Sequence, residues 1–321
     1  MHTQYNLIIS MKTTIAELQK RYAGKIDRLD LDVLLAAEIK QSREFVLTYP
    51  EYALPPLKIK KLALKIARRM RDEPLAYILG HREFFGLSFA VTPDTLIPRP
   101  ETELMMEMAL QEIRDAVETE ITVVDVGTGS GNIIISVTKA MENFKFEILN
   151  LKFYGVDISA AALKVAKKNA RTNQVAKNIT FLQGNLIEPI IKNLKLPASD
   201  RRVVVSASRD GKIKNSRIII LANLPYLSQE IYAATHPTVQ KYEPRSALYS
   251  DDAGLAHYAE LLQQIKTLKN TRDLLHVTCY MEISPEQKTK LSKIIKAIVP
   301  KAKFEFHKDL AQKWRLCQIT P

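Results

Sequence analysis

Two short segments of this 321-residue chain carry residue types that could do chemistry. Asn223, Leu224, Pro225 and Tyr226 follow one apolar run, and the glycine-rich turn 127–131 follows another. An amide or ring amino nitrogen is a weak nucleophile because its lone pair is delocalised, so a catalyst must orient it and bind its hydrogens. The Asn223 side-chain oxygen and the Leu224 carbonyl suit this task, and the Tyr226 ring can cover a planar group. The two segments together predict methyl transfer to a planar amino group.

The glycine-rich turn follows the predicted strand ITVVDV and precedes a predicted helix. Glycine at 127, 129 and 131 lets the backbone turn sharply and approach a ligand. This Gly-x-Gly-x-Gly spacing differs from the Gly-x-Gly-x-x-Gly typical of NAD sites, and it favours S-adenosylmethionine (SAM), which has no pyrophosphate. A tight turn without a ligand is the alternative interpretation.

Polar residues also end the next two predicted strands. Asp157 ends FYGVDIS, where its carboxylate can accept both hydroxyls of a ribose. Capping the following helix is the alternative role, for which Ser159 is at least as suitable. Asn185 follows ITFLQG and can either accept from an adenine amine or cap a turn. Since the carboxyl ends of parallel strands meet at one edge of a sheet, all these residues are expected in one cleft.

Strand and helix patterns alternate from residue 121 onward, which predicts an α/β fold with helices on both faces of a parallel sheet. The last segment, FEFHKDLAQKWRLCQI, predicts two closing antiparallel strands. Residues 1–80 predict a small all-helical domain, residues 81–100 an extended, proline-rich connector, and residues 101–321 the α/β domain.

Within the helical segment, two apolar faces are predicted to form its core. The first comprises Leu31, Leu34, Leu35 and Ile39, and the second Leu62, Ile66 and Met70. Thr14 and Glu17 predict a capping box for the first helix, which makes Met11 a plausible alternative start to Met1.

Composition predicts a soluble cytoplasmic protein. A hydrophobic share of 46% supports real cores, while no apolar run approaches the roughly 20 residues that span a bilayer. The start of the chain lacks the pattern of a signal peptide. Cys279 and Cys317 fit no metal or redox spacing, so no metal site and a reducing compartment are expected.

The charge is unevenly distributed. The chain has a formal net charge of +12, which suggests acidic partners. Residues 192–217 hold eight Lys or Arg against two Asp, a net of 8 − 2 = +6, and contain a hairpin signal at Asp210-Gly211. This basic insertion is expected either to contact RNA or an acidic protein surface, or simply to remain solvated.

Longer matches add a family resemblance that covers nearly the whole chain from about Thr14. The segments LDVLLAAEIKQSREFVLTYPE, EPLAYILGHREFFGLSFAVTPDTLIPRPETE, VVDVGTGSGN, GVDIS and KDLAQKWR resemble the protein-glutamine methyltransferases that modify peptide chain release factors. The resemblance implies a helical domain that engages the release factor. It also implies a SAM-dependent, Rossmann-like domain that methylates the glutamine side chain of a Gly-Gly-Gln loop.

The resemblance also implies residue roles. Asn223, Leu224, Pro225 and Tyr226 are expected to bind and orient the glutamine amide, with Arg99 in the bordering Pro98–Glu101 stretch. The cofactor is expected to contact Gly127, Thr128, Gly129, Gly131, Asp157, Ile158, Asn185 and Asn223.

Two positions depart from the family pattern. The family usually has Asn-Pro-Pro-Tyr where this chain has Leu224, which keeps the carbonyl. It usually has an acidic residue where this chain has Asn185, so a lower cofactor affinity is expected. A ribosomal-protein glutamine and an adenine of ribosomal RNA remain alternative substrates, the latter because Asn-Leu-Pro-Tyr also resembles the tetrapeptide of adenine dimethylating enzymes. A binding protein without catalysis would need a broken turn or no Asn223, and neither is seen.

Overall fold

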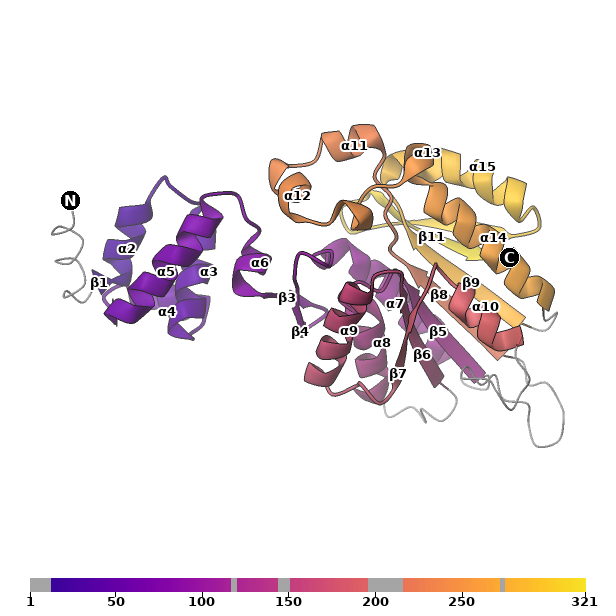
Figure 1. Cartoon of the computed structure of the whole chain (residues 1–321), viewed down its shortest axis with the longest axis horizontal. Helices are drawn as coiled ribbons and strands as arrows, with labels where there is room; N and C mark the ends of the chain where they lie inside the picture. Colours follow the sequence, from indigo (N-terminus) through magenta and orange to yellow (C-terminus); the bar gives the residue numbers. More distant parts are fainter. Residues whose placement is uncertain (1–12, 117–119, 144–150, 196–215, 272–274) are drawn as a thin grey trace. The chain divides into compact units, whose positions relative to one another are not determined.

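The protein divides into two compact units. The computed structural model (Figure 1) describes residues 13–116, 120–143, 151–195, 216–271 and 275–321. One unit comprises Met1–His81 with Pro237–Tyr242, and the other comprises Arg82–His236 with Glu243–Pro321. The predicted connector therefore falls, after its first residue, in the second unit.

The first unit is helical, as predicted, with one added pair of very short strands. The strands β1 (Thr13–Thr14) and β2 (Ala53–Leu54) pair antiparallel. The helices are α2 (Ile15–Tyr22), α3 (Arg28–Ile39), α4 (Arg43–Thr48), α5 (Pro56–Arg69), α6 (Leu75–Leu79) and α12 (Pro237–Tyr242). The last of these is distant in sequence, and it is tied in where the Tyr242 hydroxyl donates to the Arg71 carbonyl at 2.8 Å.

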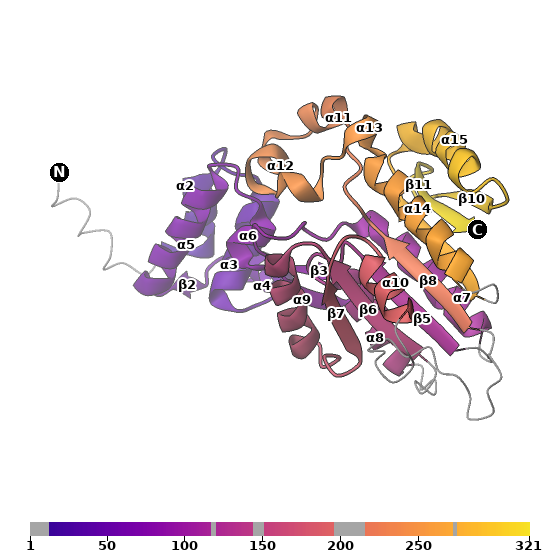
Figure 2. The same cartoon turned by 45° about the vertical axis from the view of Figure 1, so that its right-hand side comes forward.

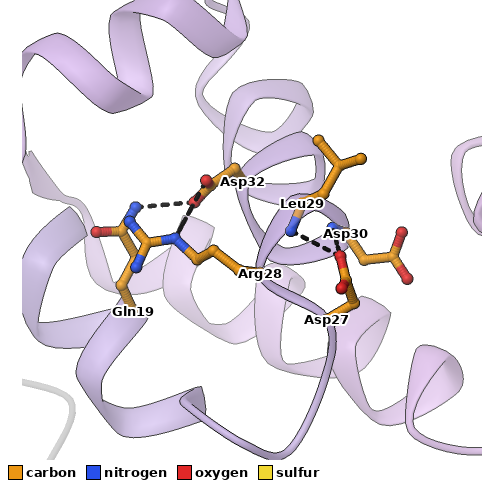
Figure 3. A network of polar contacts seen from close by, with 6 residues as sticks. All are labelled: Gln19, Asp27, Arg28, Leu29, Asp30 and Asp32. Carbon is orange, nitrogen blue, oxygen red and sulfur yellow. Dashed lines mark hydrogen bonds and ion pairs between the residues drawn. The ribbon is translucent and has the colours of Figure 1, made fainter.

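Local polar contacts set the helix starts of this unit. Thr14 and Glu17 form the predicted capping box. Asp27 caps α3 by accepting from the backbone amides of residues 29 and 30 (Figure 3). The buried Asp32 accepts from Gln19 of α2 at 2.8 Å and from Arg28 at 3.0 Å, so the carboxylate is paired and the two helices are joined (Figure 3).

The core of the helical unit contains both predicted faces except for one residue. Leu31, Leu34, Leu35, Ile39, Leu62 and Ile66 are all buried in it. Met70 is 51% exposed, so its predicted place in the core is wrong. It is the C-cap residue of α5, one turn beyond Ile66, which is the last residue of that helix buried in the core.

The second unit contains a seven-stranded mixed sheet with the order β10-β11-β9-β8-β5-β6-β7. Its strands are β5 (Glu120–Val126), β6 (Leu151–Asp157), β7 (Ile179–Gln183), β8 (Ser216–Ala222), β9 (Leu275–Glu282), β10 (Lys303–Lys308) and β11 (Trp314–Thr320). Strands β5 to β9 are parallel, and β5 to β8 are labelled in Figure 2. Strand β11 pairs antiparallel with both β9 and β10. The predicted doubly wound, Rossmann-like sheet with an antiparallel edge is confirmed.

Helices cover both faces of this sheet, because its central strands are apolar on both sides. Ile219 and Leu221 pack in one core with α7 (Glu103–Asp115), α8 (Asn132–Asn143) and α9 (Ala160–Thr172). Ile218 and Ile220 pack in the other core with α10 (Glu188–Lys195), α14 (Ala256–Thr271) and α15 (Lys288–Ile298).

Shorter elements complete the second unit. They are the hairpin β3 (His81–Phe84) and β4 (Leu87–Ala90), the helices α11 (Gln229–Ala233) and α13 (Asp251–Gly254), and the 3-10 helices η2 (Pro100–Thr102), η5 (Arg245–Ala247) and η6 (Pro285–Gln287). None of the helices among the described residues has the length and apolar character needed to cross a membrane.

Two predictions fall largely outside the described residues. The hairpin expected at Asp210-Gly211 lies there, between α10 and β8, with most of the basic insertion. So do Met1 and Met11, the two candidate starts.

Candidate active site

The candidate site lies where the strand order of the sheet reverses. Strand β5 has β6 on one side and β8 on the other, and the carboxyl ends flanking such a switch point are where open α/β sheets bind ligands. One cavity at this edge has lining residues from the ends of β5, β6, β7 and β8. Of the residues predicted from the sequence, it is lined by Arg99, Gly127, Thr128, Gly129, Asp157, Ile158, Asn185, Asn223, Leu224 and Pro225.

The turn after β5 has a backbone that favours glycine. Gly127, Gly129 and Gly131 have φ values of 70°, 53° and 80°, in the left-handed region. A Cβ on Gly127 would lie 3.0 Å from the Leu224 side chain, and one on Gly131 would lie 2.8 Å from Ile135. Gly131 is not among the residues that line the described cavity. The first glycine thus brings the turn against the Asn223 segment, and the third allows close packing of the helix that follows.

The buried carboxylate of Asp125, on strand β5, holds this turn through hydrogen bonds. Asp125 is fully buried, and its Oδ2 accepts from the Thr128 hydroxyl at 2.6 Å and from the Ile134 amide at 3.3 Å. Burial raises the pKa of Asp125 to about 7, against the lowering effect of these two hydrogen bonds. The Thr128 hydroxyl donates to Asp125 and the Thr128 amide donates to the Val156 carbonyl, so Thr128 can contact a ligand only through its oxygens, as an acceptor.

Asp157, at the end of β6, links the turn to the next helix. Its Oδ2 accepts from the Gly129 amide and its Oδ1 accepts from the Ser159 amide, both at 2.8 Å. Ser159 is the N-cap of α9, so the capping alternative for Asp157 is not needed. Burial raises the pKa of Asp157, while these backbone donors oppose the shift. Each oxygen keeps a further lone pair, which fits acceptance of two ribose hydroxyls.

Asn185, after β7, is held by a carboxylate of α14. Its Nδ2 donates to Glu260 Oε1 at 2.5 Å, so the Asn185 carbonyl oxygen is the end left to accept from an amine. Nearby in the lining, Ile158 is 72% exposed and offers an apolar surface of the kind that a nucleobase ring can cover. These residues fit the adenosine part of SAM.

On the other side of the cavity, Asn223 is anchored to two residues from distant parts of the chain. Its Nδ2 donates to the Thr102 hydroxyl oxygen at 3.0 Å, and that hydroxyl donates to Glu282 Oε2 at 2.6 Å. Glu282 is 3% exposed, at the carboxyl end of β9. Burial raises its pKa to about 7, opposed by the hydrogen bonds from Thr102 and Tyr226.

Tyr226, the last residue of the tetrapeptide, is held by hydrogen bonds to the Glu282 carboxylate and to Gln287. The Tyr226 hydroxyl donates to Glu282 Oε1 at 3.3 Å, and burial, followed by the Glu282 charge, raises the pKa of Tyr226. The Tyr226 carbonyl accepts from Gln287 at 2.7 Å. A Cβ on Gly254 would lie 2.0 Å from that carbonyl, so this position has room only for glycine. Tyr226 is not among the lining residues of the described cavity.

Arg99, predicted to border the site, is fixed by an ion pair. Its Nη2 donates to Glu243 Oε1 at 2.5 Å, and Glu243 Oε2 accepts from the Ile97 amide at 3.2 Å. The Glu243 side chain is nearly fully buried, whereas Arg99 is about one-third exposed. The connector is therefore attached to the segment that follows α12 in the sequence.

Comparison with known proteins decides the family. Residues 11–80 match the PrmC N-terminal domain, and residues 118–200 match a methyltransferase domain. The chain is 32% identical to the release factor glutamine methyltransferase of Enterococcus faecalis, over 84% of each chain. It is 33% identical to that of Nitratidesulfovibrio vulgaris, over 77% of this chain and 74% of the other, and 32% identical to that of Moorella thermoacetica, over 90% and 91%. The chain belongs to the release factor glutamine methyltransferase family.

This membership confirms the expected resemblance, the enzyme class and SAM as the cofactor. The glycine turn allows the close backbone approach that suits this cofactor, and Asp157 keeps the acceptor capacity for its ribose hydroxyls. When bound, SAM supplies a methyl group on a sulfonium, and the residues of this chain must orient the acceptor nitrogen toward it.

Sequence reasoning missed several residues that hold the site, namely Thr102, Glu243, Glu260, Glu282 and Gln287. A signal existed for one of them. Glu282 ends the apolar strand LHVTCYME, and a charged residue at the carboxyl end of a predicted parallel strand meets the same criterion that selected Asp157. Thr102, Glu260 and Gln287 lie on helices and Glu243 lies in the loop after α12, where no spacing relates them to Asn185, Asn223 or Arg99.

Proposed function

We propose that this chain methylates the side-chain amide nitrogen of the glutamine in the Gly-Gly-Gln loop of peptide chain release factors, with SAM as the donor. The observation that carries the proposal is one cavity lined by both the glycine turn with Asp157 and the anchored Asn223. Family membership at 31–33% identity over most of the chain supports the release factor as substrate.

We assign the cofactor contacts to the β5, β6 and β7 strand ends. The backbone of Gly127, Thr128 and Gly129 approaches the cofactor, and Asp157 accepts from its ribose hydroxyls. Ile158 packs against the adenine ring and the Asn185 carbonyl accepts from the adenine amine. Gly131 contributes by letting α8 and α9 pack closely behind the turn.

The substrate contacts belong to the segment after β8. The Asn223 side-chain oxygen and the Leu224 carbonyl each accept one hydrogen of the glutamine amide, which aims its nitrogen at the methyl group. Pro225 holds Leu224 extended, Arg99 borders the substrate, and Tyr226 packs nearby with its hydroxyl on Glu282. The new N–C bond forms as the S–C bond breaks, and the proton leaves the nitrogen once it has become cationic.

Outside the site, we propose that the helical unit engages the release factor, as the match to the PrmC N-terminal domain suggests. The basic insertion 192–217 either contacts RNA or an acidic protein surface, or remains solvated, and these alternatives differ in salt dependence. A cytoplasmic location stays a prediction, which cell fractionation would check.

The test is to incubate the enzyme with labelled SAM and, separately, with a release factor, ribosomal proteins and ribosomal RNA. Peptide mass analysis should place one methyl group on the glutamine of the Gly-Gly-Gln loop. A release factor with glutamate in place of that glutamine is the matched control and should take up no label. Label in RNA or in a ribosomal protein, with none in the release factor, would overturn the proposal.

A further inference from the structure

The buried carboxylate of Glu282 does not contact Asn223 directly but is joined to it through the hydroxyl of Thr102. Glu282 accepts from Thr102 at 2.6 Å, and Thr102 accepts from Asn223 Nδ2 at 3.0 Å. The three residues come from η2, the end of β8 and the end of β9. Glu282 is not among the residues that line the described cavity, whereas Thr102 and Asn223 both are.

The order of donors in this chain of contacts follows from proton counting. An ionised carboxylate only accepts, and a threonine hydroxyl has a single proton to donate. Because that proton goes to Glu282, the Thr102 oxygen can only accept from Asn223. The Asn223 amide must then present its Nδ2 to Thr102, which leaves its Oδ1 as the group that faces a substrate.

This orientation matters because the two ends of an asparagine amide have similar shape and opposite polarity. Methylation of a glutamine amide needs an acceptor for its N–H. A reversed Asn223 would instead present its own N–H donors to the N–H of the substrate, and the two groups could not hydrogen-bond. We infer that Glu282 and Thr102 are positioning residues that select the acceptor orientation of Asn223. The inference rests on the proposed function, since that function sets which end of Asn223 is needed.

Other buried contacts keep Glu282 in place. The Tyr226 hydroxyl donates to its second oxygen, and the Tyr258 hydroxyl donates to its backbone carbonyl. In the sheet, Glu282 pairs with Leu316 of β11. Both carboxylate oxygens therefore accept hydrogen bonds and the backbone of Glu282 is fixed. Loss of the charge would change the hydrogen bonds of Thr102 and Tyr226 rather than move Glu282.

The arrangement also predicts a pH dependence. A protonated Glu282 can donate to the Thr102 oxygen, and the Thr102 hydroxyl can then donate to Asn223. Asn223 would accept this proton with its Oδ1, which favours the reversed amide orientation. Burial raises the pKa of Glu282 to about 7. The groups whose charges act on it are Glu101 from η2 and Arg315 from β11, while Tyr226 bonds it directly and Tyr258 of α14 bonds its carbonyl. Turnover should therefore fall as the pH drops through about 7.

The experiment is a double-mutant cycle with Thr102→Val and Asn223→Ala. Thr102→Val removes the hydroxyl at nearly constant shape, and we expect turnover to fall roughly tenfold to a hundredfold with SAM affinity unchanged by calorimetry. Because Thr102 acts through Asn223, the double variant should be no slower than Asn223→Ala alone. Thr102→Ser keeps the hydroxyl and should retain most of the turnover.

Two further variants complete the test. Thr138→Val removes another buried hydroxyl, one that donates to the Ile134 carbonyl within α8, and should leave turnover unchanged. Glu282→Gln should lower turnover at pH 8 and lose the acidic limb of the profile. The inference would be overturned by wild-type turnover in Thr102→Val or by additive losses in the double variant. It would also be overturned if Glu282→Gln had the same dependence of turnover on pH as the wild type. Failure of the proposed function would instead appear in the wild-type enzyme, as label on a different substrate.

Discussion

The two halves of the cavity are built in different ways. The cofactor half, comprising the 127–131 turn, Asp157 and Asn185, uses a backbone shape and residues at the ends of three adjacent strands. The substrate half, comprising Asn223–Tyr226 with Thr102 and Glu282, is held by side-chain contacts between residues that are 56 to 180 positions apart in the sequence. Most of the cofactor half is thus specified by local backbone geometry, with Glu260 added to hold Asn185, whereas the proposed catalytic amide of Asn223 has its orientation fixed by side chains from distant segments.

The largest effect expected from this comparison is at Asn223. Asn223→Ala removes the acceptor for the substrate N–H, and turnover should fall on the order of a hundredfold or more, as for other lost oriented polar groups. Affinity for SAM, measured by calorimetry, should change little because the cofactor half is intact. A wild-type rate in this variant would mean that the tetrapeptide is only a loop, and a large loss of SAM affinity would mean that the halves are not separable.

Asp157 tests the opposite half. Asp157→Ala removes the carboxylate proposed to bind the ribose, and SAM affinity should fall roughly tenfold to a hundredfold, equivalent to roughly 1.5 to 3 kcal/mol. Turnover at saturating SAM should fall much less than in Asn223→Ala. Circular dichroism serves as the control for folding, since Asp157 also accepts from Gly129 and Ser159. Unchanged SAM affinity would remove Asp157 from the site.

A smaller effect is expected from placing the usual acidic residue of the family at position 185, and the contact with Glu260 reverses the direction expected from the sequence alone. Asn185→Asp would place a second carboxylate beside Glu260, whose Oε1 now lies 2.5 Å from the Asn185 amide. Like charges at a partly exposed site repel moderately, so SAM affinity should fall roughly threefold to tenfold. Adding Glu260→Gln should restore it, because the repulsion is then removed. Tighter binding in the single variant would show that Glu260 does not orient Asn185.

The smallest effect concerns the basic insertion, which belongs to neither half. Neutralising Arg201, Arg202, Arg209, Lys212 and Lys214 together should leave SAM affinity unchanged and raise the KM for the release factor a few-fold at low salt. Contacts through screened charge weaken as salt increases, so the difference should disappear at high salt. Identical kinetics across a salt series would leave the insertion with no role in substrate capture.

The same division explains how far the sequence could be interpreted. Strand periodicity, turn glycines and strand-end polar residues are local patterns, and they predicted the α/β fold and the cavity-lining residues Gly127, Gly129, Asp157 and Asn223. Local patterns do not report pairings across the fold. Thr102 reaches Asn223 only because η2, which follows the connector, and β8 end at one edge. Glu260 reaches Asn185 only because α14 packs against α10 and the segment that follows β7.

Met70 shows the limit within a single element. Its spacing from Ile66 matches a helical face, but the helix ends at Arg69, and periodicity cannot indicate where a helix stops. The left-handed backbone at Asp252 and Ala253, with φ values of 52° and 58°, was equally unforeseen, because non-glycine residues rarely adopt it.

The antiparallel closing hairpin has a consequence for the order in which the enzyme matures during synthesis. Every residue of the cofactor half lies before position 186, whereas Glu282 pairs in the sheet with Leu316, close to the end of the described chain. A ribosome adds roughly 5 to 20 residues each second and releases the amino-terminal parts first. The nascent enzyme should therefore acquire the ability to hold its methyl donor seconds before it can align an acceptor. A chain stalled before Lys303 would lack β10 and β11 and so leave β9 as an unpaired edge, and it should bind SAM without transferring its methyl group.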